Sequence, residues 1–174
     1  MIILRIIGSL LIVTSSSLIG YIYGKKYSDR LNNILHMKNC IRLLETEIIY
    51  GANPIPEAFL NIYNKGNKKF SFIFKYIRDY LFQNKNANLL DGFLSVEDVL
   101  KEELLFKKED VEVFLSLGRM LGNSDRSDQE KNFKLIFMEI GNLEEEAREE
   151  KEKNEKVYKN LGLLFGVALV IILL

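Results

Sequence analysis

A proline-free stretch from Ser127 to Leu174 restricts the fold of this chain more than any other feature of its 174 residues. It begins with apolar residues at helical spacing and ends in an uncharged apolar run, Leu161 to Leu174. Between these parts, Glu144 to Lys159 is almost entirely charged or polar. This order predicts one long helix that leaves a soluble core, continues through water as a stalk and enters a membrane.

The charges of the stalk favour a helix that stands in water without core contact. Glutamates precede lysine or arginine by four residues at Glu144 and Arg148, Glu149 and Lys153, Glu152 and Lys156, and Glu155 and Lys159. Each such pair contributes about 0.2–0.5 kcal/mol to a solvated helix. We therefore interpret the stalk, Glu144 to Lys159, as a solvated charged face rather than a binding surface.

A second apolar run lies near the start of the chain, from Ile6 to Tyr23. Its uncharged residues would extend roughly 27 Å as a helix, which approaches the thickness of the hydrocarbon core of a bilayer. A transmembrane anchor and a secretory signal peptide are the alternatives. The anchor is favoured because only Arg5 precedes the run, no Ala-x-Ala site follows it, and Tyr21 and Tyr23 suit the membrane interface. We predict an anchor over residues 1–24.

The C-terminal run, residues 160–174, is predicted to be a second transmembrane segment. Its fourteen apolar residues extend roughly 21 Å, which is short for a span unless Tyr158 to Asn160 lie at headgroup level or the bilayer thins locally. A re-entrant or interfacial tail is the alternative. Basic residues cluster after the first run and before the second. By the positive-inside rule, residues 25–159 form a cytoplasmic domain and both termini lie across the membrane.

Composition and motifs indicate a non-enzymatic protein. The 24 basic residues balance the 24 acidic ones, with no basic tract of the kind that binds nucleic acid. The single cysteine, Cys40, has no disulfide partner, and the single histidine, His36, has no cluster of metal ligands around it. Phosphate-binding loops, nucleophile elbows and zinc-protease motifs are absent from the sequence. We predict no catalytic residue, no cofactor, no metal and no nucleic acid.

Apolar residues at spacings of three and four, without a convincing strand pattern, predict an all-α bundle of about five to six helices. The predicted soluble helices run from about Ser28 to Tyr50, from Glu57 to Tyr63, from Phe70 to Leu81, over one or two short segments between Leu89 and Leu105, and from Lys108 to Leu121. The first of them and the stalk enter one membrane from the same side. They must therefore run antiparallel, as a coiled-coil-like pair.

Turn-forming and capping residues mark the ends of these helices. The candidates for a structural or interaction role are Gly51, Pro54, Pro56, Glu57, Gly122 and Asp125. Gly51 is predicted to take a left-handed conformation after the first soluble helix. Pro56 suits the first turn of the next helix, and Asp125 or Ser127 can cap the long C-terminal helix.

Small residues recur four apart in both apolar runs, at Gly20 and Gly24 and at Gly162 and Gly166. Apolar surface gives helices in lipid no preference for one another, so transmembrane helices pack through close approach at small residues. Antiparallel spans from one domain would bring Gly20 and Gly24 towards Gly162 and Gly166.

Three local strings are characteristic as a set: Tyr50 to Phe59, Leu121 to Asp125 with Gln129, and Leu143 to Arg148. Together they resemble the stage III sporulation protein AB family, and the resemblance covers nearly the whole chain. Phe59 departs from the family pattern, which tends to have a smaller aliphatic residue there.

The resemblance implies a mother-cell membrane component of the channel complex between mother cell and forespore in endospore-forming bacteria. Its soluble domain would be similar to the cytoplasmic domain of the type II secretion and type IV pilus platform protein. Its partners would be the lipid bilayer, other sporulation channel proteins and a cytoplasmic secretion-type ATPase, with homo-oligomerisation left open. A structural platform is our leading hypothesis. The alternative is a membrane-anchored sensor or regulator that signals through the stalk, which we disfavour because little of the chain lies beyond either membrane segment.

Overall fold

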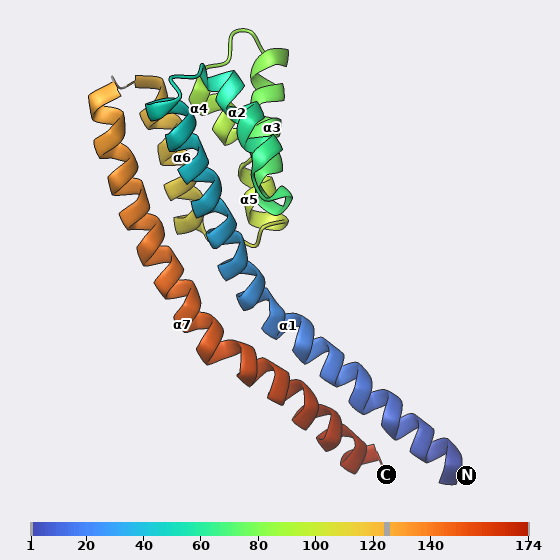
Figure 1. Cartoon of the computed structure of the whole chain (residues 1–174). Coiled ribbons are helices and arrows are strands. Elements are labelled where there is room, and N and C mark those ends of the chain that lie inside the picture. Colours follow the sequence, from blue (N-terminus) through green and yellow to red (C-terminus); the bar gives the residue numbers. More distant parts are fainter. Residues whose placement is uncertain (1, 124–125, 174) are drawn as a thin grey trace. The chain divides into compact units, whose positions relative to one another are not determined.

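All regular secondary structure is helical in the computed structural model, which describes residues 2–123 and 126–173. The elements are α1 (Ile2–Glu45), the π-helix η1 (Thr46–Tyr50), α2 (Ile55–Lys65), α3 (Lys68–Gln83), α4 (Leu89–Leu94), α5 (Glu97–Glu102), α6 (Lys108–Asn123) and α7 (Arg126–Leu173) (Figure 1). No strand occurs in the two described ranges. The predicted all-α class is therefore confirmed.

The chain divides into two compact units. One, which we call the helical domain, consists of residues 32–145, and the other, the terminal helix pair, consists of residues 1–31 with residues 146–174. Both boundaries fall inside the long helices α1 and α7, which therefore contribute to both units. The soluble helix expected to begin near Ser28 is in fact the continuation of α1, because the polarity changes there without a helix-breaking residue.

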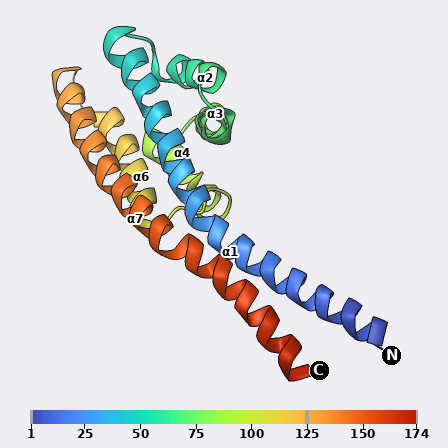
Figure 2. The same cartoon turned by 60° about the horizontal axis from the view of Figure 1, so that its bottom comes forward.

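An aromatic cluster forms the centre of the helical domain. The ring of Phe114 in α6 lies 5.6 Å from that of Phe70, 5.9 Å from that of Phe74 and 5.0 Å from that of Phe93, measured between centroids. Phe59 of α2 is fully buried and also meets Phe74, at 5.5 Å. These rings join α2, α3, α4 and α6. In both cartoon views α6 runs beside the first half of α7 (Figures 1 and 2).

The prediction for Gly51 is wrong. Gly51 has φ −77° and ψ −22°, a right-handed conformation, and the left-handed residue is Ala52 with φ 50°. The cause is the π-helical turn of η1, in which the Gly51 N–H donates to the carbonyl of Thr46 at 2.9 Å. This wider turn keeps Gly51 helical and moves the change of direction one residue further along the chain.

The other turn candidates lie at or near helix ends. Pro54 is the residue before α2, Pro56 occupies its first turn, and the Glu57 N–H donates to the Pro54 carbonyl at 3.0 Å. Gly122 lies in the last turn of α6. Asp125 lies outside the described residues.

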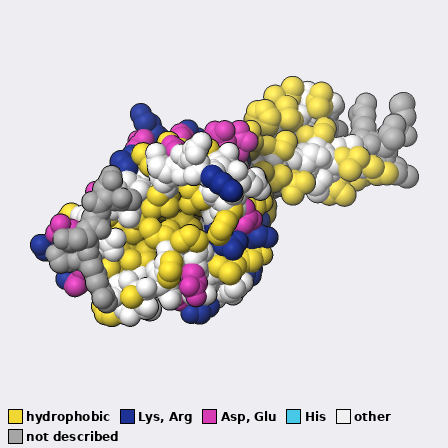
Figure 3. Space-filling model, turned by 90° about the horizontal axis from the view of Figure 1, so that it is seen from above, with side chains coloured by type: hydrophobic (Ala, Val, Ile, Leu, Met, Phe, Trp, Pro, Cys, Tyr) yellow, Lys and Arg dark blue, Asp and Glu magenta, His cyan; other side chains and the backbone are white. Residues whose placement is uncertain are grey.

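Two helices, α1 and α7, are long and apolar enough to cross a membrane by length and composition. Only 6% of the most apolar window of each is buried. The core helix of a soluble domain would be mostly buried. Their apolar surface is therefore not accounted for by packing within the chain, and Figure 3 shows hydrophobic side chains over much of the visible surface of the terminal helices.

Candidate functional site

Gly20 and Gly162 lie in direct backbone contact in the terminal helix pair. A Cβ atom added to Gly20 would lie 2.6 Å from the Tyr158 carbonyl oxygen and 2.7 Å from Gly162 Cα. One added to Gly162 would lie 2.7 Å from Gly20 Cα and 2.8 Å from the Ser16 carbonyl oxygen. The two backbones touch here, and not even a methyl group fits between them.

The other two glycines lie on either side of this contact. A Cβ on Gly24 would lie 2.7 Å from the Glu155 carbonyl oxygen, and one on Gly166 would lie 3.0 Å from both Ser16 Cβ and Val13 Cα. The contacts follow opposite orders along α1 and α7, so the two helices are antiparallel. Gly20 therefore meets Gly162, whereas Gly24 and Gly166 approach other residues. We call these four residues the glycine interface.

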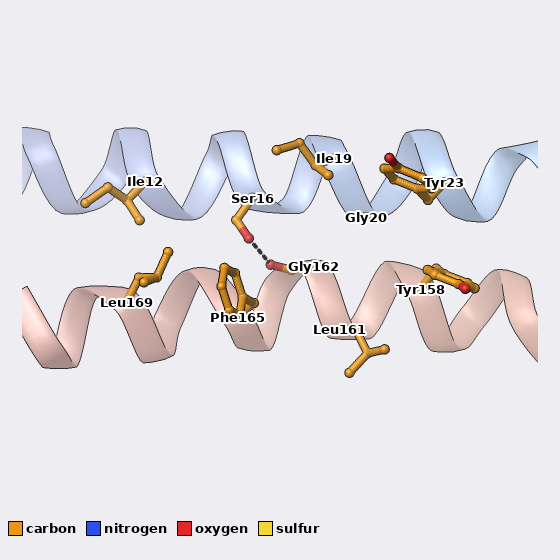
Figure 4. Close-up of a pocket in the computed structure, with 10 residues that line it drawn as sticks. All are labelled: Ile12, Ser16, Ile19, Gly20, Tyr23, Tyr158, Leu161, Gly162, Phe165 and Leu169. Carbon is orange, nitrogen blue, oxygen red and sulfur yellow. Dashed lines mark hydrogen bonds between the residues drawn. The ribbon is translucent and has the colours of Figure 1, made fainter.

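A hydrogen bond strengthens the glycine interface. The Ser16 hydroxyl donates to the Gly162 carbonyl at 2.6 Å (Figure 4). That carbonyl is a backbone group of α7, so the bond joins the two helices beside the contact of Gly20 with Gly162. A hydroxyl that crosses between helices in this way has satisfied its hydrogen-bonding potential within the protein rather than in lipid.

Tyrosines and ion pairs continue the pairing beyond the glycine interface. The Tyr158 ring stacks with Tyr23 at 6.3 Å and with Tyr27 at 5.7 Å between centroids. The Arg30 side chain, only 5% exposed, reaches Glu150 at 2.9 Å and Glu146 at 3.5 Å. These partners are on opposite helices, so α1 and α7 remain joined along this length.

The stalk is consequently not a free-standing helix as we expected. Its Ala147 is buried, and Glu146 and Glu150 pair with an arginine of the other helix. Of the pairs expected within the stalk, Glu155 and Lys159 meet at 2.6 Å. Arg30 of α1 therefore pairs with two glutamates of the stalk that the sequence predicted to be solvated.

An apolar groove runs along one side of the terminal helix pair, with a volume of about 600 Å³. Its lining residues are Ile12, Ser16, Ile19, Gly20, Tyr23, Tyr158, Leu161, Gly162, Phe165 and Leu169 (Figure 4). In Figure 4 the two tyrosines lie at one end, and Ile12 and Leu169 lie towards the other. Most of these residues are hydrophobic, so the groove is suited to an apolar ligand rather than to a polar one.

A second cluster, the Glu47 cluster, lies in the helical domain at the turn from η1 to α2. The buried Glu47 carboxylate accepts hydrogen bonds from Asn53 Nδ2, Asn61 Nδ2 and Lys65 Nζ, each at 2.7 Å. Hydrogen bonds from Lys65 and then Asn61 hold the pKa of Glu47 below its usual value. The cluster fixes the loop between η1 and α2. Tyr50, which precedes this loop, is 74% exposed.

The Glu47 cluster predicts a specific loss of stability in acid. Because its pKa is lowered on folding, Glu47 contributes stability that is fully present above the ordinary pKa of 4.5 and is lost as the pH falls through the lower pKa of the folded protein. The Glu47→Gln variant should be less stable than the parent at pH 7 and should lack this part of the acid dependence. Thermal melting of the full-length chain in detergent, from neutral to acid pH, measures the stability at pH 7 and its acid dependence. If the melting temperatures of the parent and of Glu47→Gln fell in parallel with pH, Glu47 would not be the source of this acid dependence.

The neighbouring turn predicts two substitutions with opposite effects. Ala52→Gly should stabilise the helical domain by about 0.5–1 kcal/mol, since a left-handed conformation strains alanine more than glycine. Gly51→Ala should destabilise it by at least about 1 kcal/mol, because the added Cβ would lie 2.7 Å from the Glu47 carbonyl oxygen and 2.9 Å from Asn53 Nδ2. Urea unfolding of the two variants measures these changes in the free energy of unfolding. If Gly51 were the left-handed residue instead, Ala52→Gly would destabilise the domain.

The single cysteine and the single histidine both lie in surroundings that shift their pKa values. Burial raises the pKa of the Cys40 thiol to about 12, which leaves it protonated and unreactive. Burial and the charge of Lys69 lower the pKa of His36. No group of three histidine, cysteine, aspartate or glutamate side chains in the described part of the chain is placed to hold a metal ion.

The fold and these sites define an all-α protein in which a helical domain is continuous with two paired apolar helices. Comparison with known families narrows this class. The family described as stage III sporulation protein AB matches residues 5–174. The chain belongs to this family, which confirms the resemblance inferred from its local strings.

Two relatives illustrate the extent of the match. Stage III sporulation protein AB of Bacillus subtilis (strain 168) is 30% identical over 171 residues, which cover 98% of this chain and 99% of the relative. A solved structure of stage III sporulation protein AB is 26% identical and superposes with a TM-score of 0.58, covering 71% of this chain and 96% of that one. The similarity extends over nearly the full length of both relatives.

Proposed function

We propose that this chain is a non-enzymatic platform component of the sporulation channel complex between mother cell and forespore. Residues 1–24 and 160–174 anchor it in the mother-cell membrane, and residues 25–159 lie in the cytoplasm. The observation that carries the proposal is the continuity of the helices. Both α1 and α7 pass without a break from the glycine interface into the helical domain. A close-packed helix pair of this kind supplies a fixed anchor, which a platform requires.

The partners of the helical domain would be a secretion-type ATPase in the cytoplasm and other channel proteins. Several large hydrophobic side chains of the domain are exposed, among them Tyr50, Met138 and Leu135. Figure 3 shows an area of hydrophobic side chains on the helical domain with charged side chains around it. Hydrophobic surface with a polar border is typical of protein interaction sites. Further copies of the chain are a second candidate partner for this hydrophobic area.

Co-purification tests the platform role. Full-length protein with an affinity tag, recovered from sporulating cells in mild detergent, should carry channel proteins and the ATPase with it. Tyr50→Ser and Met138→Ser should reduce recovery of the cytoplasmic partner, because each removes an exposed apolar side chain without disturbing the core. Lys85→Ser, at another exposed position, serves as the control. Recovery of the chain alone under conditions that preserve the complex would count against the platform.

Topology provides the independent test. A reporter fused to the C-terminus should be active only outside the cytoplasm, whereas a cysteine placed at exposed Lys85 should react only with probes that enter the cytoplasm. Cytoplasmic activity of the C-terminal reporter would show that residues 160–174 form a re-entrant or interfacial tail instead of a span.

A further inference from the structure

The apolar groove of the terminal helix pair has the depth of one membrane leaflet. It extends from Tyr23 to Ile12 on α1 and from Tyr158 to Leu169 on α7. Either stretch corresponds to about 17 Å of helix, which is roughly half of the ~30 Å hydrocarbon core. A transmembrane helix packed against this pair would continue across the bilayer. An acyl chain, in contrast, ends near the bilayer midplane and matches the length of the groove.

The wall of the groove suits a flexible hydrocarbon chain. Phe165, Ile19 and Leu161 present exposed apolar side chains along it. The hydroxyl of Ser16 is directed to the Gly162 carbonyl, so this polar group is already satisfied by the protein. The two remaining side-chain hydroxyls, on Tyr23 and Tyr158, lie together at one end, where aromatic residues with a polar tip meet the lipid headgroups.

A lysine stands at the tyrosine end of the groove. Lys26 Nζ lies 5.0 Å from the centroid of the Tyr23 ring. Nearby cations already have acidic partners, Lys25 with Asp29 at 4.0 Å and Lys159 with Glu155 at 2.6 Å. Among the residues whose side chains are described, Lys26 has no carboxylate oxygen within 4.0 Å. Its ammonium group is thus available to an anion at headgroup depth.

We propose that the groove binds an acyl chain of an anionic phospholipid from the cytoplasmic leaflet, with the lipid phosphate paired to Lys26. This rests on the membrane insertion in the proposed function. The site selects for charge because the groove holds the chain of any lipid, whereas Lys26 favours a headgroup with net negative charge. A single lysine at an anionic surface contributes about 1 kcal/mol, which corresponds to a preference of about fivefold over a zwitterionic lipid. The preference weakens as salt screens the lysine.

Tryptophan fluorescence tests this directly, because the chain contains no tryptophan. The full-length Phe165→Trp variant places one reporter in the groove, and Leu164→Trp places one outside it at nearly the same exposure, 63% against 64%. Both proteins are reconstituted in vesicles of phosphatidylcholine with a minor fraction of phosphatidylglycerol, with brominated acyl chains on one lipid or the other. Bromine quenches tryptophan only at contact.

The expected result is a preference for brominated phosphatidylglycerol of about fivefold at Phe165→Trp and close to none at Leu164→Trp. Adding Lys26→Gln should remove the preference at the groove reporter. The matched substitution Lys25→Gln removes a neighbouring cation that already has an acidic partner, and it should retain most of the preference.

Three results overturn the proposal in distinguishable ways. Quenching at Phe165→Trp in proportion to the mole fraction of each brominated lipid means that the groove takes up bulk lipid without selection. Quenching at Leu164→Trp alone means that a protein helix, from a partner or a second copy, covers the groove. An absence of quenching at both positions means that the helix pair is not in the bilayer, and in that case membrane insertion and the proposed function fail as well.

Discussion

Gly162→Leu is expected to force apart the two terminal helices and to reduce the yield of heat-resistant spores about tenfold. The Cβ alone would lie 2.7 Å from Gly20 Cα, and backbone atoms on both helices leave no flexible side chain to move aside. Overpacking of this kind costs about 1–3 kcal/mol, and 1.4 kcal/mol is a factor of ten in an equilibrium. Leucine itself favours the bilayer, so insertion should be unaffected.

The control for this prediction is Gly8→Leu, because a Cβ at Gly8 meets nothing within 4 Å. It makes the same chemical change in the other apolar run and should leave spore yield unchanged. Cysteines at Ser16 and Gly166, whose side-chain positions are adjacent, should cross-link in the parent and fail to do so beside Gly162→Leu. If Gly162→Leu cells sporulate normally and the cysteines still cross-link, the glycine interface has no role.

Periodic features were the ones that the sequence predicted well. Apolar residues at spacings of three and four predicted the helices that contain Phe70, Phe74 and Phe114, and these three residues are fully buried. Glycines four apart in both apolar runs likewise indicated where the terminal helices could approach. In each case the relevant information lies within one helix, where the 3.6-residue repeat decides which side chains share a face.

Features that depend on the relative register of distant segments could not be predicted. Arg30 meets Glu150, 120 positions further along the chain, and no local pattern marks either residue as the partner of the other. The Glu47 cluster unites residues from η1, the following loop and α2, which meet only because the chain reverses between them. The π-helical turn contains one more residue than an α-helical turn, and the left-handed residue is therefore Ala52 rather than the predicted Gly51.

Phe59 shows how a departure from a family pattern is accommodated. In the family pattern a smaller aliphatic residue is usual at this position. In the structure Phe59 is fully buried between Phe74 at 5.5 Å and Phe93 at 6.0 Å. The larger ring thus joins an aromatic cluster in which tilted and edge-on contacts are favourable, and it needs no change of fold.

The largest loss of stability in the helical domain is expected from Phe114→Ala, at about 3–5 kcal/mol. Phe114 is fully buried, and its ring lies within 6 Å of three other phenylalanine rings from α3 and α4. Truncation therefore leaves a cavity that helices on several sides would have to close together. Since a domain is stable by only about 5–15 kcal/mol, this one change removes a large share.

Urea unfolding of the full-length protein in detergent measures the effect of Phe114→Ala as a lowered midpoint with an unchanged slope. Phe82→Ala is the matched control, because Phe82 is 59% exposed and its ring meets the Arg78 guanidinium at 4.6 Å. Losing that exposed contact should cost no more than about 1 kcal/mol. Equal midpoints for the two variants would mean that the phenylalanine cluster does not hold α3, α4 and α6 together, and the core of the domain would then have to lie elsewhere.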